Sequence, residues 1–347
     1  MAPAILVELD PVLLGSLLIL ILSWWFCCLS GRGKRGMRSM SEDMSLYENQ
    51  RLAFRQQLIE ARIELLDLVH AQKCAPILLR LAWSDAAAFN RRKEWPHCGG
   101  ANGSIRAQVE LEHPANAGLS KAINYLAPLK ARFPRISWAD LIQMGGAVAV
   151  ESSGGPKIYM RYGRIDADLS SCDWVKSARL PCPCYPFPDK AITPAIHVRN
   201  VFFRLGFDSA ETVALMGGHT LGRAFKDRTG VCEYASGDQG ATRYTRQNSV
   251  VRADGTTGVG MAGGQSWTKL WLQFDNSYFH RVVADKVDPE LLWLPTDDAL
   301  IESPEYHPFF LKFAQNQSAF FLTYSAAHKK MSELGARFDP IDGIYLE

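Results

Sequence analysis

The 347-residue chain lacks an excess of charge of either sign, because 38 Lys and Arg residues are balanced by 36 Asp and Glu residues. The resulting net charge of +2 gives no reason to expect a nucleic-acid partner. The sequence also contains no internal repeat, and its eight cysteines show no regular spacing. We therefore expect neither a repeat protein nor a disulfide framework, and we interpret most cysteines as free thiols in a reducing compartment.

The sequence has few stretches in which apolar and polar residues alternate, which is the pattern typical of strands. From Leu46 onward, apolar residues instead recur every three to four positions, as in amphipathic helices. Residues 208–211 read Asp-Ser-Ala-Glu, a capping-box pattern that predicts a helix ending at Gly217-Gly218, with His219 at its C-terminal end. From these patterns we predict an all-α fold. Because 47% of the residues are hydrophobic, the chain can also bury a large core.

Other segments refine this helical pattern. Pro76 is suited to the first turn of a helix that carries residues 80–88, and another helix is predicted from about Ser318 to Leu334. Residues 231–266 are rich in Gly, Thr and Ser, which predicts a long surface insertion with a small hairpin turning at Asp254-Gly255.

The N-terminus carries a long apolar run. Residues 12–30 are mostly Leu, Ile, Val, Trp and Phe, and this run is just long enough to span a bilayer as a helix. Acidic residues precede it and basic residues follow it: Glu8, Asp10, Arg32, Lys34, Arg35 and Arg38. A cleaved signal peptide would have its positive charge before the run, and a core helix is seldom apolar on every face. The pattern therefore favours a membrane anchor.

From these patterns we predict four regions. They are a short N-terminal tail (1–11), a transmembrane anchor (12–30), a basic linker (31–46) and a folded domain (47–347). Because positive charge follows the anchor, the domain is expected on the cytoplasmic side of the endoplasmic reticulum or plasma membrane, as part of a single-pass membrane protein.

Two motifs within the domain carry residues suited to chemistry. Residues 79–87 read LRLAWSDAA and place Arg80, Trp83 and Ser84 at positions i, i+3 and i+4, on one face of a helix. An arginine on such an apolar face is costly without an anionic partner. Residues 214–223 read ALMGGHTLGR and contain His219. A lone histidine is weak evidence for a site, but further motifs follow in Ser266-Trp267-Thr268 and in residues 294–297, LPTD.

Together these motifs resemble the class I haem peroxidases, the group of ascorbate and cytochrome c peroxidases. The resemblance extends from about residue 47 to 338, and it implies haem b held between a distal helix and a proximal helix in a two-lobed fold. The lobes would span about 47–165 and 166–347. It also implies that His219 binds the iron and that Asp297 accepts hydrogen bonds from both His219 and Trp267, which tunes the imidazole as a ligand.

On the distal side, the resemblance assigns Arg80 to the stabilisation of charge as the O–O bond of peroxide breaks, and places Trp83 over the haem. The family has a histidine at the position of Ser84, which takes a proton from hydrogen peroxide. A hydroxyl cannot do this near neutral pH, and loss of a general acid–base group costs about 10²–10⁴ in rate. Glu110 and Asn116 match the pair that orients the missing histidine.

The sixth coordination position of the iron has several candidates. Cys98 lies in a loop that in the family runs along the distal side, and its thiolate could bind the iron. The neighbouring His97 is another candidate ligand or displaced base. Water or an empty position remains a further alternative.

Substrate and cation positions of the family are partly kept. Arg228 matches the arginine that holds the ascorbate anion, whereas Gln72 replaces a lysine that assists it. Potassium is a further expected cofactor, because Thr220, Thr268 and Asp275 match its ligand positions. Other ligand positions are changed, so this site remains an open prediction.

These expectations leave several functions open. We expect a haem-dependent protein that removes oxidants, acts weakly on hydrogen peroxide and ascorbate, and has peroxynitrite as a candidate substrate; this is a pseudoperoxidase of the membrane-anchored kind. One alternative is a slow but genuine hydrogen peroxide-dependent peroxidase that uses ascorbate or cytochrome c. Another is a haem-based redox sensor. A haem-free scaffold is disfavoured because the His-Trp-Asp set is complete.

Overall fold

The computed structural model describes residues 44–170, 180–182, 185–229, 240–258, 260–284 and 288–346. The chain divides into two compact units, Met1–Gln56 and Gln57–Glu347. The predicted anchor at 12–30 lies outside the described residues, so it stays a prediction. Among the residues that are described, no helix combines the length and the apolar character that a membrane span requires.

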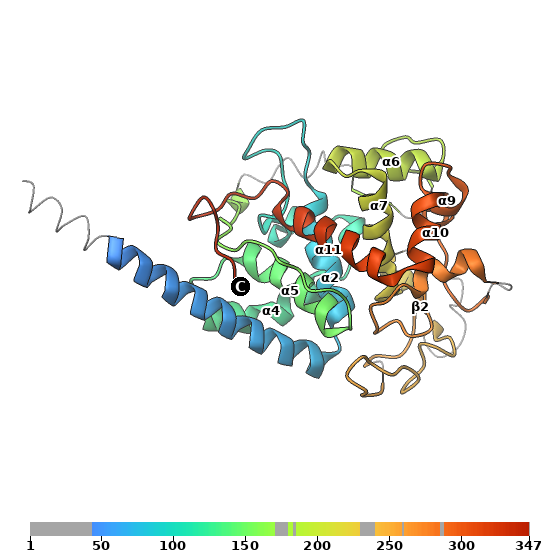
Figure 1. Ribbon diagram of the computed structural model, residues 1–347, viewed down its shortest axis with the longest axis horizontal. Helices are drawn as coiled ribbons and strands as arrows, with labels where there is room; N and C mark the ends of the chain where they lie inside the picture. The colour runs from blue at the N-terminus through green and yellow to red at the C-terminus, as the bar shows by residue number, and fades with distance from the viewer. Residues whose placement is uncertain are drawn as a thin grey trace, which may run out of the picture. The chain divides into compact units, whose positions relative to one another are not determined.

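The second unit is built mainly from helices, as the sequence predicts (Figure 1). Residues 44–72 are helical. The α-helices that follow are α2 (Ala75–Ala87), α3 (Gln108–Leu111), α4 (Ser120–Arg132), α5 (Trp138–Ser152), α6 (Pro194–Leu205), α7 (Ser209–Met216), α8 (Lys226–Thr229), α9 (Pro295–Glu302), α10 (His307–Gln315) and α11 (Gln317–Glu333). Short 3-10 helices occur at η1 (Ser104–Arg106), η2 (Pro114–Asn116), η4 (Gly217–Thr220) and η6 (Ser277–Val283).

The strands of the described residues are short. β1 (Arg223–Ala224) pairs with β2 (Gln265–Ser266) in an antiparallel register that joins Arg223 to Ser266. Within the predicted insertion, Val251 and Thr257 form an isolated antiparallel bridge around Gly255, so the expected small hairpin is confirmed.

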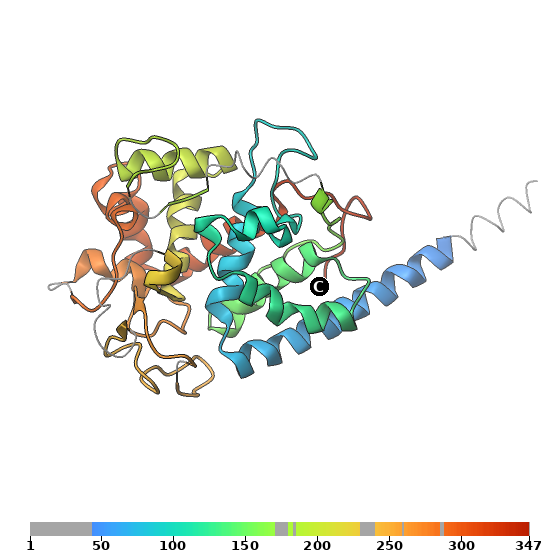
Figure 2. The same ribbon diagram turned by 180° about the vertical axis from the view of Figure 1, so that it is seen from behind.

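Helices α2 and α5 form the centre of one half of this unit, where they pack against each other in both views (Figures 1 and 2). Helix α2 begins as predicted, with Pro76 in its first turn. The two helices approach closely at Gly146, where an added Cβ would lie 2.6 Å from the Cβ of Ala82. This contact requires glycine, and it fixes the position of the helix that carries Arg80, Trp83 and Ser84.

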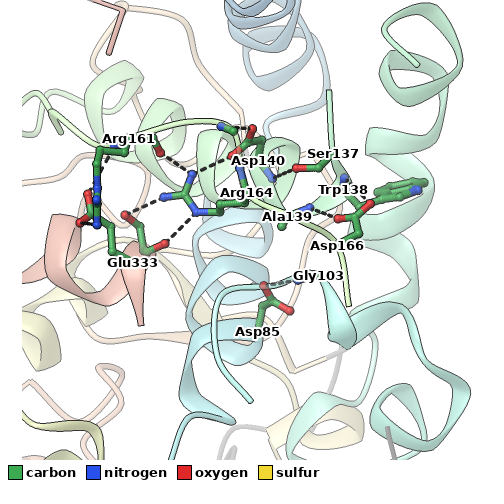
Figure 3. Close-up of polar contacts among 12 residues, drawn as sticks. Asp85, Gly103, Ser137, Trp138, Ala139, Asp140, Arg161, Arg164, Asp166 and Glu333 are labelled. Atoms are coloured by element: carbon green, nitrogen blue, oxygen red, sulfur yellow. Dashed lines mark hydrogen bonds and ion pairs between the residues drawn. The ribbon is translucent and has the colours of Figure 1, made fainter. Parts of the chain in front are cut away.

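A buried polar network holds the segment after α5 in place (Figure 3). Arg164 and Asp140 form an ion pair of 2.8 Å in which both side chains are fully buried. Arg164 also donates from Nε to the Ser332 carbonyl of α11, at 2.9 Å. Separating a buried ion pair leaves uncompensated charges, which is costly. The network therefore holds α5 and α11 in a fixed position relative to each other.

The loop that precedes η1 is fixed to the back of α2. The two carboxylate oxygens of Asp85 accept hydrogen bonds from the backbone N–H groups of Gly103 (3.0 Å) and Ile105 (3.2 Å). Figure 3 shows Asp85 beside Gly103, below the Asp140–Arg164 pair. Asp85 follows Ser84 directly, so it anchors this part of the helix from the side opposite to the site described below.

The other half of the unit positions His219. Helix α7 starts with the predicted capping box between Asp208 and Glu211, and it continues into η4, which contains His219. A cluster of aromatic rings surrounds this region, with Phe279 contacting Phe310, Phe313 and Phe320 at ring distances of 5.0, 5.4 and 4.9 Å. The cluster joins η6, α10 and α11 into one packed support.

Candidate active site

A cavity of about 820 Å³ lies between α2 and the α7–η4 segment. Its size is within the range of small-molecule and cofactor sites. Its described lining residues include the predicted Arg80, Trp83, Ser84, Asn116, His219, Trp267 and Arg228. The structure therefore brings the two sequence motifs together across one space.

The side of the cavity that contains His219, the proximal side, is a complete hydrogen-bonded set. His219 Nδ1 lies 2.9 Å from Asp297 Oδ1, and Trp267 donates from Nε1 to Asp297 Oδ2 at 2.8 Å. The imidazole and indole rings stack with their centroids 4.3 Å apart. The carboxylate keeps the imidazole proton on Nδ1, so Nε2 carries the free lone pair of the ring.

Asp297 is fully buried and accepts two further hydrogen bonds, from the Tyr278 hydroxyl (2.8 Å) and the Leu294 backbone N–H (2.9 Å). Burial alone would raise the pKa of Asp297, but the His219 imidazole and the hydrogen bonds outweigh it and lower the pKa. The carboxylate is therefore ionised, which strengthens His219 as a ligand.

Tyr278 is a site residue that the sequence reasoning missed. It lies in the string of residues 274–279, FDNSYF, which resembles the family, yet nothing in that string shows where the Tyr278 hydroxyl points. Only a general rule could have indicated its role: a buried tyrosine hydroxyl usually has a hydrogen-bond partner.

Two other described histidines line the cavity, and both have their acceptor nitrogens occupied. His113 Nδ1 accepts the Ala115 N–H at 3.1 Å. Nε2 of His197 accepts the Cys182 N–H at 3.1 Å, while its Nδ1 lies 2.8 Å from an oxygen of Asp189. Among the described lining histidines, His219 alone keeps a ring nitrogen free to bind a metal.

Arg80 lies on the opposite side of the cavity, the distal side, where the segment that contains η2 holds it. Its guanidinium donates to the carbonyls of Ala117 (3.0 Å) and Ala115 (2.8 Å). Burial, together with the positive charge of Arg228, lowers the pKa of Arg80 to about 10, so it stays protonated at neutral pH. This segment therefore aims a fixed positive charge at the cavity.

Ser84 is buried against the cavity and makes no side-chain hydrogen bond with the described residues. Nearby, Asn116 donates from Nδ2 to the main-chain carbonyl of Glu110 at 2.9 Å. Asn116 Oδ1 accepts no hydrogen bond from the described residues. The predicted pair of Glu110 and Asn116 is thus in contact, and its free amide oxygen has no imidazole to orient.

The side chain of Glu110 does not line the cavity. It is fully buried, and neither of its oxygens has a hydrogen-bond partner among the described residues. Burial raises the pKa of Glu110 to about 8; the nearby Ser104 hydroxyl opposes this shift, and the charge of Asp85 adds to it. Glu110 is therefore mostly protonated at neutral pH, and its carbonyl is the part that positions Asn116.

Cys98 and His97 also lie away from the cavity. Cys98 is buried, and its thiol donates to the neighbouring Gly99 carbonyl at 3.5 Å. His97 is exposed. Neither residue is among the cavity lining, so the arrangement does not favour the expectation that either binds iron. Cys74, Cys98 and Cys182 are free thiols, as expected for these three.

Arg228 lies at the edge of the cavity on α8. It packs over the Phe225 ring at 4.3 Å and has a distant ion pair of 4.0 Å with Asp227. Its side chain also contacts the backbone at Gly118, where an added Cβ would lie 3.1 Å from Arg228 Cδ. Arg228 is thus placed where a small anion could reach it from the cavity.

The predicted potassium ligands lie together at the C-terminal end of η4, which contains Thr220. Thr220 Oγ1 donates to Asp275 Oδ1 at 3.1 Å, and Thr268 Oγ1 donates to the Thr220 carbonyl at 3.0 Å. These hydrogen bonds join the three residues directly. Potassium binding at this cluster stays a prediction.

The donor set fits the haem that the resemblance implies. A single free imidazole nitrogen on His219 stands on one side of the cavity, and Arg80 and Trp83 stand on the other. The anionic Asp297 behind the imidazole is the partner that iron-bound histidines commonly have. His219 would therefore hold the iron, and Trp83 would cover the opposite face.

Comparisons with known proteins agree with this assignment. A family model described as "Peroxidase" matches residues 56–316. The chain is 46% identical to "L-ascorbate peroxidase T, chloroplastic" of Arabidopsis thaliana over 292 residues, which are 84% of this chain and 63% of that protein. It is 44% identical to "Probable L-ascorbate peroxidase 5, chloroplastic" of Oryza sativa subsp. japonica, over 84% of each.

A third relative is "L-ascorbate peroxidase 5, peroxisomal" of Arabidopsis thaliana, which is 40% identical over 81% of this chain and 82% of that protein. The chain thus spans less than two thirds of the first relative and more than four fifths of the other two. On the combined evidence of the family match, these identities and the His-Trp-Asp geometry, the chain belongs to the peroxidase family, whose haem-type members imply a haem cofactor.

Proposed function

We propose that the protein is a haem-dependent oxidoreductase that removes oxidants, with slow turnover of hydrogen peroxide and with peroxynitrite as a further substrate. The family match and the ascorbate peroxidase relatives support a peroxidase-type reaction. The observation that carries the finer proposal is Ser84, which stands on the distal helix with no free basic nitrogen near it among the described lining residues.

The residues on the proximal side would support the iron. When bound, haem supplies the iron that cleaves the O–O bond of the oxidant. His219 would hold this iron through Nε2, while ionised Asp297 makes the imidazole a stronger electron donor. Trp267 shares the same carboxylate and stacks on the imidazole, so it lies in direct contact with the ligand.

Hydrogen peroxide requires a proton shuttle. One of its oxygens must lose a proton, and the other must gain one before it leaves as water. A general acid–base group that makes this transfer contributes about 10²–10⁴ in rate. Ser84 cannot act as such a group near neutral pH, and Arg80 is protonated and cannot accept a proton. This deficit supports slow turnover of hydrogen peroxide.

Peroxynitrite makes a different demand. Its isomerisation to nitrate rearranges the same atoms, so it needs no net proton and no external reductant. The positive charge of Arg80 lines the cavity and can attract this anion. A site that keeps its arginine but lacks a base is therefore suited to peroxynitrite.

The electron donor is proposed to be a small anion such as ascorbate. Arg228 lines the cavity, and the carboxylate paired with it in the described part of the chain, that of Asp227, lies 4.0 Å away. Cytochrome c remains the alternative donor. The oxidation rates of both donors should be measured side by side, because a preference for ascorbate is the expected result.

The decisive experiment compares Ser84→His with the wild type and with Ser84→Ala. Stopped-flow measurement of the haem-loaded proteins should show hydrogen peroxide reacting about 10²–10⁴ times faster with Ser84→His. Ser84→Ala should behave like the wild type, because the hydroxyl is not the missing base. Peroxynitrite decay should be accelerated by the wild type already. A wild type that reacts rapidly with hydrogen peroxide, and gains nothing from Ser84→His, would contradict the proposal.

We also propose that residues 12–30 anchor the protein in a membrane, with the haem domain on the cytoplasmic side. The apolar run and the basic residues after it support this. Deletion of residues 1–43 should move the protein from the membrane fraction to the soluble fraction. Protease added to intact vesicles should then report on which side the domain of the full chain lies.

A further inference from the structure

The cavity is lined by a group of polar side chains that make no side-chain hydrogen bond with the described residues. Lys121 is exposed on α4, and Tyr125 lies one helical turn further along the same face. Both line the cavity, and neither side chain makes a hydrogen bond with a described residue. Arg228 completes the group, since its only ion pair there is the distant one with Asp227.

The segments that carry these three residues meet at Gly118. The backbone N–H of Lys121 donates to the Gly118 carbonyl at 3.3 Å, which places the lysine directly after this turn. Arg228 Cδ packs against Gly118 from the other side. The charge of Arg228 also acts on Tyr125, opposing the rise in its pKa that burial causes. Helices α4 and α8 thus present a lysine, a tyrosine and an arginine to one edge.

The described lining of the cavity as a whole contains more basic than acidic side chains. The described lining contains six basic residues and one acidic residue: Lys73, Arg80, Lys121, Arg223, Lys226, Arg228 and Asp227. The charge of Arg228 reinforces the effect of burial in lowering the pKa of both Arg80, to about 10, and Arg223, to about 9. An anion at this edge would relieve the repulsion between like charges.

Three of the six basic residues already have acceptors. Arg80 donates to two carbonyls of the η2 loop, Lys73 Nζ donates to the Thr257 carbonyl at 2.8 Å, and Arg223 donates to the Gly263 carbonyl at 2.6 Å. When bound, the two carboxylates of haem b would pair with some of the basic residues that have no hydrogen-bond acceptor among the described residues. They do not require a tyrosine hydroxyl or a lysine as exposed as Lys121.

We propose that Lys121 and Tyr125 act with Arg228 as the binding site for a small organic anion that reduces the enzyme. Lys121 supplies a second positive charge, and the Tyr125 hydroxyl hydrogen-bonds an oxygen of the same molecule. This inference rests on the proposed function, since it names residues that select the reductant of that reaction. Lys121 and Tyr125 are specificity-determining residues here, and ascorbate is the probe that tests them.

The experiment measures ascorbate binding to the haem-loaded full chain by calorimetry, alongside the KM for ascorbate. Lys121→Gln should raise both Kd and KM about two- to fivefold, the range expected when one partner of an exposed ion pair is removed. Tyr125→Phe should raise them less. Lys312→Gln is the matched control, because Lys312 is an exposed lysine on α10 that does not line the cavity.

Salt and a double variant separate binding from a general structural effect. The Kd of the wild type should rise with ionic strength more steeply than that of Lys121→Gln, because one attractive charge is gone. Lys121→Gln combined with Arg228→Gln should cost less than the two single changes added together, if both bind one anion. Strict additivity with equal salt dependence would overturn the proposal.

The outcomes distinguish this proposal from the proposed function. If ascorbate binds the wild type and Lys121→Gln equally well, the inference about Lys121 is wrong while the enzyme assignment stands. If Lys121→Gln weakens binding but no variant, including Ser84→His, oxidises ascorbate with any oxidant, the anion site exists and the proposal that ascorbate is the electron donor is wrong. If the wild type does not bind ascorbate at all, this inference is wrong.

Discussion

The two sides of the cavity differ in how completely their polar groups are paired. On the proximal side, Asp297 accepts four hydrogen bonds, from His219, Trp267, Tyr278 and Leu294. On the distal side, the amide oxygen of Asn116 and both carboxylate oxygens of Glu110 have no hydrogen-bond partner within the described segments. One side has therefore retained the complete set of contacts that a histidine ligand needs. The other has Ser84 at the position where the resemblance to the family predicts a histidine base.

The largest effect is expected from removal of the shared proximal acceptor. Asp297→Ala leaves the four donors without their partner, two of them ring N–H groups, in a buried site. We expect the free energy of unfolding to fall by about 3–5 kcal/mol, as when one partner of a buried polar pair is lost. Chemical denaturation measures this loss, with the exposed neighbour Asp298→Ala as control. A loss no greater than that of the control would show that the proximal set is not a structural unit.

A second prediction concerns the unpaired distal carboxyl. The folded protein holds the proton of Glu110 until about pH 8, whereas the unfolded chain releases it near the ordinary pKa of 4.5. Unfolding therefore releases a proton between these values, and stability from this group falls as pH rises through the window. In the wild type, this group should lower the free energy of unfolding by on the order of 3 kcal/mol between pH 5 and pH 8. Glu110→Gln should abolish that pH-dependent loss.

Denaturation midpoints across this pH range measure the Glu110 effect. Glu112→Gln is the control, because Glu112 is exposed and hydrogen-bonded to Gln108. A pH profile that is the same for Glu110→Gln and the wild type would mean that Glu110 titrates in its ordinary range, and that a partner for it exists in the folded protein.

A smaller proximal effect should follow from Tyr278→Phe. This change removes one hydrogen bond to the buried Asp297 carboxylate and leaves the ring packing in place. Hydrogen bonds to charged groups contribute about 1.5–3 kcal/mol, so the loss should be smaller than that of Asp297→Ala. Tyr306→Phe is a suitable control, because Tyr306 is buried but makes no side-chain hydrogen bond in the described residues. If both variants lose the same free energy of unfolding, the loss arises from packing and not from the hydrogen bond to Asp297.

The sequence predicted most of the proximal side, because its residues lie in local motifs. The capping box at 208–211 and the glycines before His219 define one helix end, and the family resemblance supplies Trp267 and Asp297. Tyr278 was missed because the direction of its hydroxyl depends on packing between η6 and α9. The roles of Lys121 and Tyr125 were also missed, since only the fold brings α8 beside the segment η2 that precedes α4.

The distal loop was harder to predict for the same reason. The family resemblance made Cys98 one of several candidates for the sixth ligand of the iron, because the family's loop runs along the distal side. In the structure, Cys98 is fixed within its own loop, where its backbone carbonyl accepts the Asn90 N–H at 2.7 Å. Such contacts depend on how the loop closes on itself, and no residue pattern in the segment indicates it.

The smallest expected effect tests this placement of Cys98. The optical spectrum of the ferric, haem-loaded protein should be the same in Cys98→Ala as in the wild type, because the thiol does not line the cavity. Cys74→Ala is the matched comparison, since Cys74 is a buried free thiol that does line it. Thiolate binding to haem iron changes the spectrum strongly, so even partial ligation would be visible. A spectrum altered only by Cys98→Ala would mean that the loop can reach the iron, and that a thiolate stands on the distal side where the family has a histidine base.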